Sequence, residues 1–187
     1  MKKSTIIIIA IAVVVVAILS VLYFNTDSAS NLPDINNAED LTKLVDSIYA
    51  GITDEMPGVM SQPIDVTDSD SVNYMTGLEN GNELEYLVVS EPMMSSQAYS
   101  LVVAKVKSGV NASKVAETMK TNINTRKWIC VSAEKLYATN SGDVVFLVMT
   151  RADLATSVLN SFKTLAGKTG QIFERTEQEA ELPTDMY

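Results

Sequence analysis

The chain has 187 residues, of which 23 are acidic and 14 basic, and its formal net charge is −9. It has no histidine and one cysteine, which excludes Ser-His-Asp and Cys-His catalysis, histidine-based metal sites and an internal disulfide. The acidic charge disfavours nucleic acid and anionic lipid headgroups as ligands, and nothing in the composition indicates a cofactor.

An unbroken apolar run, residues 6–24, follows Lys2 and Lys3. These nineteen residues would rise about 28 Å as a helix, which is enough to cross a hydrocarbon core of roughly 30 Å. No further basic residue occurs before Lys43. The positive-inside bias therefore predicts a single-pass membrane protein with residues 1–5 in the cytoplasm and the rest, after about residue 25, outside the cell membrane.

Cleavage of this run as a signal peptide is the alternative, and Ser28-Ala29-Ser30 offers small residues for a peptidase. A lipoprotein anchor is excluded, because it needs a cysteine at the end of the apolar run. The single cysteine, Cys130, lies in the apolar sequence Trp128-Ile129-Cys130-Val131, and we expect it to be a buried, unreactive side chain.

Three parts follow the predicted anchor. Residues 25–37 are polar and rich in turn formers, which is typical of a flexible linker. Residues 38–167 carry periodic apolar patterns and are long enough for one domain. Residues 168–187 hold five acidic residues and little apolar content after Phe173, which predicts a disordered tail.

The periodicity of the domain predicts its elements in chain order. A helix is expected over 38–50, and a second, capped by Thr67 with Asp70, over 68–76; a hairpin through Asn80-Gly81 is the competing prediction. Strands are expected over 84–89, 99–104, 135–139 and 144–149, with a turn over 140–143. Asn111 introduces another helix, and Thr150 with Asp153 predicts a capping box for a last helix that stops at Gly167.

Short connections favour antiparallel pairing of these strands. The predicted fold class is therefore α+β: an N-terminal transmembrane helix followed by a compact domain with a mainly antiparallel four-stranded sheet and helices on one face.

Three segments, Ser90-Glu91-Pro92-Met93-Met94-Ser95-Ser96-Gln97-Ala98, Arg126-Lys127-Trp128-Ile129-Cys130-Val131 and Asn140-Ser141-Gly142-Asp143, occur in this order. Together they resemble a family of membrane-anchored or lipoprotein domains of unknown function that is common in clostridia and their relatives. The resemblance covers about residues 38–165 and implies a Gram-positive envelope location. It implies no reaction and no catalytic residue, but an association with membrane O-acyltransferases that act on surface polymers.

The connection between two predicted strands, Pro92, Met93, Met94, Ser95 and Ser96, is the first candidate binding segment. Side chains alternate along an extended chain, so two adjacent methionines cannot both point inward. An exposed methionine suits adaptable protein contacts, whereas a buried one fills gaps in a core. The serines are expected to form turn hydrogen bonds, because no base is visible nearby.

Arg126, Lys127 and Trp128 form the second candidate binding segment. Two cations beside an aromatic ring can bind a carboxylated or sugar ligand. The same residues also suit the C-terminal end of a helix followed by a buried tryptophan.

Two chemical motifs are rejected. Ser132-x-x-Lys135 and Lys168-Thr169-Gly170 look like motifs of penicillin-binding enzymes, but they lie too close together and lack the required Ser-x-Asn element between them. Asp65, Asp68 and Asp70 do not fit a calcium-loop frame and are read as charges at a helix N-terminus.

The sequence thus predicts a non-enzymatic, membrane-tethered binding or assembly domain whose partner is another envelope or membrane protein. A sensor for a small envelope ligand, with a pocket near Arg126 and Trp128, is the alternative. A carboxylate-based hydrolase would require two acids about 5–9 Å apart in a cleft.

Overall fold

The computed structural model describes residues 30–94 and 96–177. Within these residues no helix has both the length and the apolar character needed to cross a membrane. The predicted span, residues 6–24, lies outside the described part, as do Ser95 and residues 178–187.

A six-stranded antiparallel sheet forms the centre of the domain, with the order β1-β2-β3-β5-β4-β6. Its strands are β1 (Val59–Pro63), β2 (Leu84–Pro92), β3 (Ser100–Val106), β4 (Lys135–Ser141), β5 (Val144–Thr150) and β6 (Phe173–Thr176). The α+β class and the antiparallel pairing are confirmed, but the prediction of four strands is wrong. β1 and β6 are short edge strands that alternate half-buried with exposed residues and carry no strong apolar signal.

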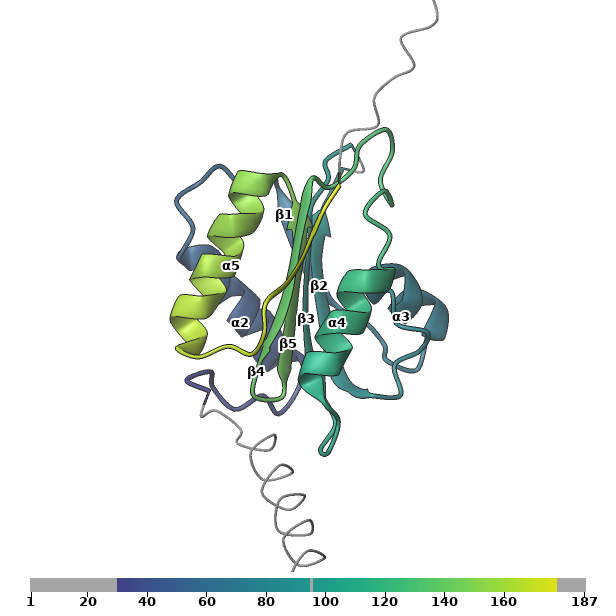
Figure 1. Ribbon diagram of the computed structural model, residues 1–187, viewed down its shortest axis with the longest axis vertical. Coiled ribbons are helices and arrows are strands. Elements are labelled where there is room, and N and C mark those ends of the chain that lie inside the picture. Colours follow the sequence, from purple (N-terminus) through teal and green to yellow (C-terminus); the bar gives the residue numbers. More distant parts are fainter. Residues whose placement is uncertain (1–29, 95, 178–187) are drawn as a thin grey trace, which may run out of the picture.

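Helices cover both faces of this sheet, whereas the sequence predicted helices on one face (Figure 1). The helices α2 (Ala38–Ala50) and α5 (Ala152–Ala166) pack on one face, and α3 (Ser69–Thr76) and α4 (Ala112–Asn122) pack on the other. All seven residues of β5 are buried. A continuous apolar run is typical of a strand covered on both sides, and Val144–Met149 carried that signal in the sequence.

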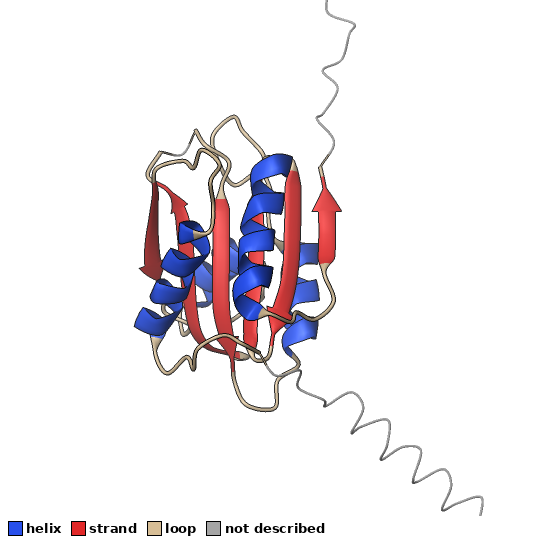
Figure 2. Cartoon of the chain, turned by 90° about the vertical axis from the view of Figure 1, so that its left-hand side faces the viewer, coloured by secondary structure: helices blue, strands red, loops and turns tan. Residues whose placement is uncertain are grey.

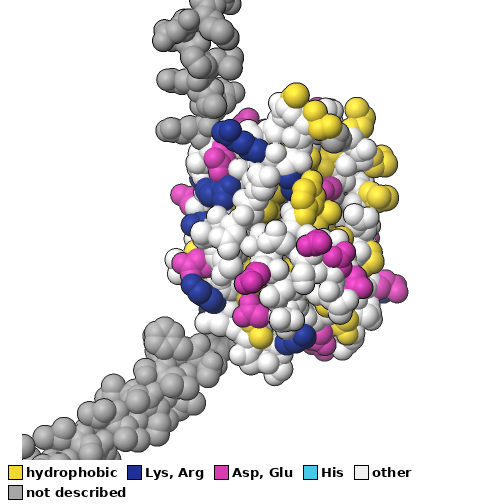
Figure 3. All heavy atoms as spheres, turned by 90° about the vertical axis from the view of Figure 1, so that its right-hand side faces the viewer, with side chains coloured by type: hydrophobic (Ala, Val, Ile, Leu, Met, Phe, Trp, Pro, Cys, Tyr) yellow, Lys and Arg dark blue, Asp and Glu magenta, His cyan; other side chains and the backbone are white. Residues whose placement is uncertain are grey.

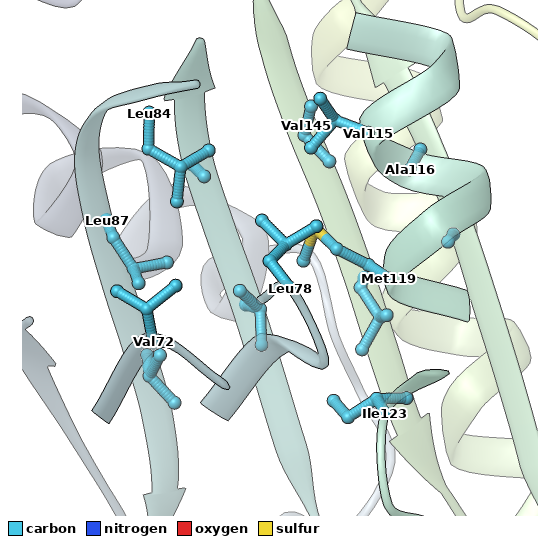
Figure 4. Close-up of a cluster of buried hydrophobic side chains, with 14 of the residues drawn as sticks. Val72, Leu78, Leu84, Leu87, Val115, Ala116, Met119, Ile123 and Val145 are labelled. Carbon is cyan, nitrogen blue, oxygen red and sulfur yellow. The ribbon is translucent and has the colours of Figure 1, made fainter. Parts of the chain in front are cut away.

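Two apolar cores result from this arrangement. Figure 4 shows the core under α3 and α4, where Met119 and Ile123 of the α4 region approach Leu78, and Leu87 lies beside Val72. The second core lies between the sheet, α2 and α5, and contains the stacked rings of Phe146 and Phe162. Because side chains alternate along each strand, one strand such as β2 contributes to both cores.

The domain extends beyond both of its predicted boundaries. Ser30 and Ile35 belong to the predicted linker, but Ile35 is buried and the Ser141 hydroxyl lies 2.8 Å from the Ser30 hydroxyl. At the other end, β6 pairs with β4, and Arg175 donates to main-chain carbonyls of the α4 region. The prediction of disorder is therefore wrong for residues 168–177.

Two helix caps differ from the prediction. Asp68, not Thr67, caps α3, because its carboxylate accepts the Ser71 N–H. At α5 the Thr150 hydroxyl donates instead to the carbonyl of Ala98 at 2.8 Å. The helices themselves are confirmed, since apolar periodicity defines them and the cap only adjusts where they begin.

The strand ends define two ends of the domain. The hairpin end holds the β4–β5 turn and the first described residue, Ser30. The loop end, at the top of Figure 1, holds the loops 51–58, 93–99 and 123–134. Both predicted binding segments lie at the loop end, opposite the point where the chain enters the domain.

Candidate functional site

The structure brings the two predicted binding segments together at the loop end. The ammonium of Lys127 lies against the carboxylate of Glu91, the residue that precedes Pro92. The segments come from different elements, β2 with its following loop and the loop between α4 and β4. Their proximity therefore arises from the tertiary fold alone.

Lys127 is enclosed on all sides, because its side chain has no solvent-exposed area. Its Nζ atom lies 3.4 Å from the Ser100 hydroxyl and 5.3 Å and 5.7 Å from the ring centres of Tyr74 and Trp128. Burial lowers the pKa of Lys127, and the neighbouring carboxylate of Glu91 opposes this shift. Lys127 thus acts as an internal cation that holds two loops together, and a ligand cannot reach it.

Trp128 is half-buried and Arg126 is exposed. The indole N–H of Trp128 is buried without an acceptor among the described residues, so packing and the cation–π contact hold the ring. In the predicted cation and aromatic platform the cation–π contact therefore faces inward, and Arg126 has an exposed guanidinium with no salt bridge to any described residue.

Several large apolar side chains at the loop end, near the Lys127–Glu91 pair, are exposed. We call this set the apolar surface, and its members and their exposed fractions are Met60 (56%), Tyr74 (51%), Met93 (73%), Met94 (63%) and Ile129 (65%). Figure 3 shows apolar side chains gathered in the upper part of the face that α3 and α4 cover. Exposed apolar residues that cluster, rather than scatter singly, mark interaction sites.

Several contacts tie these residues to the ion pair. Met60 lies directly opposite Glu91 in the β1–β2 ladder. The Tyr74 hydroxyl donates to the main-chain carbonyl of Lys127 at 3.2 Å. Ile129 follows in the same loop. The ion pair therefore fixes the support on which the apolar surface is built.

The first predicted segment lies at the end of β2 and in the loop that follows it. Met93 and Met94 are both exposed, Ser96 is exposed and Pro92 is half-buried, while Ser95 lies outside the described residues. Met60, Tyr74 and the role of Glu91 were not predicted from the sequence. No local signal could have found them, since Met60 and Tyr74 come from β1 and α3, and the cation that pairs with Glu91 lies in the loop after α4.

Cys130 is exposed, contrary to the prediction of a buried thiol. Its apolar neighbours suggested burial, but Ile129 is also exposed, and the backbone turns at Cys130 with a φ of 61°. A positive φ is uncommon for a residue with a Cβ atom. At this tight turn the side chains of Ile129 and Cys130 both face solvent.

A cavity of about 320 Å³ opens at the loop end beside the apolar surface. Its lining includes Gln97, Ala98, Ser132, Glu134 and Arg151. Arg126 and Trp128 are not part of this lining. Glu134 is already engaged, because its carboxylate accepts the first N–H of α5, from Ala152, at 3.1 Å.

The described residues contain no group of three or more cysteine or acidic side chains placed to hold a metal ion. The carboxylates of Asp65 and Asp68, which suggested a calcium loop, accept hydrogen bonds from neighbouring residues of the chain instead. Hydrogen bonds from Thr67 lower the pKa of Asp65, and those from Ser71 lower the pKa of Asp68. Ser100, the hydroxyl nearest to Lys127, is fully buried and cannot meet a substrate.

Comparison of the chain with protein-family models, with curated proteins and with solved structures found no match.

Proposed function

We propose that this chain is a single-pass membrane protein whose extracytoplasmic domain binds another envelope or membrane protein through the apolar surface. One observation carries the proposal: five large apolar side chains, each more than half exposed, lie at one end of the domain, whereas the sixth large exposed apolar side chain among the described residues, Ile172, is only 37% exposed. A side chain of this size gains about 1.5–3 kcal/mol from full burial, so covering the apolar surface favours association.

The position of the chain entry supports this function. Ser30 lies at the hairpin end, and only residues 25–29 separate it from the predicted span. Five extended residues reach at most about 18 Å. A domain held this close by its hairpin end turns its loop end, and with it the apolar surface, away from the bilayer.

The resemblance to clostridial envelope domains supports the same location. An accessory role beside a membrane enzyme that modifies surface polymers is the specific version that we propose. In that role the domain would hold or position the enzyme and would carry out no chemistry itself.

The small-ligand sensor has weaker support. Its expected site was near Arg126 and Trp128, and the cavity at the loop end is lined by other residues. The hydrolase has the least support: Glu55 and Glu134 both line the cavity, but the Glu134 carboxylate already accepts the first N–H of α5.

The decisive test places a photo-crosslinking residue at Met94 of the full-length protein in intact host cells. A matched control carries the same residue at Ser108, which is exposed at the hairpin end. We expect one protein adduct from position 94 and none from position 108. Equal adducts from both positions, or none from either with the protein folded at the cell surface, would contradict a specific contact at the loop end.

A further inference from the structure

The edge strand β1 has main-chain groups along its outer side that no described residue pairs with. Figure 2 shows β1 at the left-hand edge of the sheet. Hydrogen bonds from Met93 to Gly58 and from Ile64 to Leu87 fix the register of the β1–β2 ladder. In an antiparallel pair alternate residues bond inward, so Val59, Ser61 and Pro63 direct their main-chain groups away from β2.

Pro63 fits this assignment, because a proline without an N–H is tolerated where that group would face solvent. Two outward donors remain, the N–H groups of Val59 and Ser61. Three outward carbonyls accompany them. This pattern can accept one further antiparallel strand.

Natural sheets protect such edges with charged side chains. The opposite edge strand, β6, follows this rule with Glu174 and Arg175. β1 has the sequence Val-Met-Ser-Gln-Pro and carries no charge. Met60, a member of the apolar surface, lies within it.

The part of the chain that contains β1 is strongly acidic. Residues 44–104, which include β1, α3 and β2, contain ten acidic residues and no lysine or arginine. The cations that reach this region from elsewhere are already engaged: Lys127 with Glu91, Lys105 with Glu85, Lys107 with the carbonyl of Asn82, and Arg151 with Asp153 and the carbonyl of Glu55. The field at this edge therefore attracts positive charge.

We propose that the free edge of β1 accepts an extended basic segment of the partner protein as a seventh strand. This inference rests on the proposed function and names how its partner binds. Main-chain hydrogen bonds to Val59 and Ser61 would supply affinity, and alternate side chains of the added strand would lie beside Met60. Lysine or arginine residues of the segment would meet the acidic surroundings.

A second copy of the chain fits this edge less well. Two β1 strands that pair antiparallel point in opposite directions, so the hairpin ends of the two copies would lie at opposite ends of the pair. Short tethers to one membrane do not allow this arrangement. Two acidic edges would also repel each other.

The test uses full-length protein in nanodiscs of phosphatidylcholine and a fluorescent peptide of eight alternating valine and lysine residues. Fluorescence anisotropy measures binding, and empty nanodiscs give the background. Ser61→Pro removes one outward donor, whereas Ser61→Ala keeps that donor and is the matched control. We expect Ser61→Pro to weaken binding roughly tenfold, the loss that corresponds to about one hydrogen bond, and Ser61→Ala to leave it nearly unchanged.

A second measurement leaves the protein unaltered, so that it decides even where Ser61→Pro does not fold. Full backbone N-methylation removes every main-chain N–H donor of the peptide, while its lysine side chains stay charged, and should abolish binding; a valine–glutamate peptide should not bind. Equal affinity of the parent and N-methylated peptides, or of folded Ser61→Pro and wild type, would overturn the strand addition. A Met94 adduct in cells that persists in Ser61→Pro would retain the proposed function and reject this mode of binding.

Discussion

The ammonium of Lys127 lies against the carboxylate of Glu91, and this pair joins the loop after α4 to the end of β2. The lysine side chain has no exposed area, while the glutamate keeps 21% of its side-chain area exposed. On the outside of this pair lie Met60, Tyr74 and Ile129. The support of the proposed binding surface is thus a buried charge pair and not apolar packing alone.

Lys127→Met should destabilise the protein, because it leaves the mostly buried Glu91 without a cation. We expect a loss of about 2–4 kcal/mol in the free energy of unfolding, measured by urea denaturation followed through the single tryptophan, Trp128. The double variant Lys127→Met, Glu91→Gln should recover most of the loss. A double variant no more stable than Lys127→Met would show that the pair is not the source of the effect.

Met94→Asp should leave the fold intact and abolish the crosslink to the partner from a probe at Met93. Met94 is 63% exposed, and exposed substitutions change stability by about 0.5 kcal/mol or less. Met119→Asp is the matched comparison in the core, where an unpaired carboxylate should unfold the domain. Thermal denaturation separates the two variants, and a large drop for Met94→Asp would place Met94 in the core.

Gly77→Ala should be much more harmful than Gly109→Ala. Both glycines have positive φ, 76° and 83°, and alanine costs about 1–2 kcal/mol in that conformation. At Gly77 a Cβ atom would also lie only 2.7 Å from the carbonyl carbon of Asn122, at the junction of α3 with α4, whereas at Gly109 it meets nothing within 4 Å. Equal unfolding free energies for the two variants would contradict this close packing.

Tyr49 and Tyr99 should resist ionisation. Their hydroxyl groups lie 3.2 Å apart, and burial is the main cause that raises the pKa of both phenols. The unfolded chain ionises these phenols near their usual pKa of about 10, so their contribution to stability is complete below that pH. It is lost as the pH rises toward the folded-state pKa values.

An alkaline titration of tyrosinate absorbance measures this effect. Tyr49→Phe with Tyr99→Phe should remove the late, unfolding-linked step of the titration. Ionisation of all tyrosines in one early step, with the domain still folded, would show that the pair is accessible to water.

Cys130 should react with a maleimide in the folded protein, because its side chain is exposed. Labelling followed by mass spectrometry should be complete without denaturant. Binding of the partner to the neighbouring apolar surface should slow the reaction. Labelling that requires urea would restore the sequence-based expectation of a buried thiol.

The long apolar patterns predicted much of the fold. Leu41, Leu44 and Ile48 marked α2 by their helical spacing, and the alternation around the turn 140–143 marked the β4–β5 hairpin. The predictions failed for the short edge strands and for the second face of the sheet. β1 and β6 bury too few residues to show a pattern. Helices on the second face could have been predicted only by interpreting the apolar run of β5 as a strand that is covered on both sides.

The sequence by itself determined the class of the domain, its main helices and strands, its acidity and the absence of histidine chemistry, because each of these depends on local composition or periodicity. Only the tertiary structure decided that Glu91 meets Lys127, that Met60 and Tyr74 join Met93 and Met94, and that β1 is left with a free edge. Such contacts link residues far apart in the chain. They depend on strand order and on which face of the sheet each helix covers, and no local pattern encodes either.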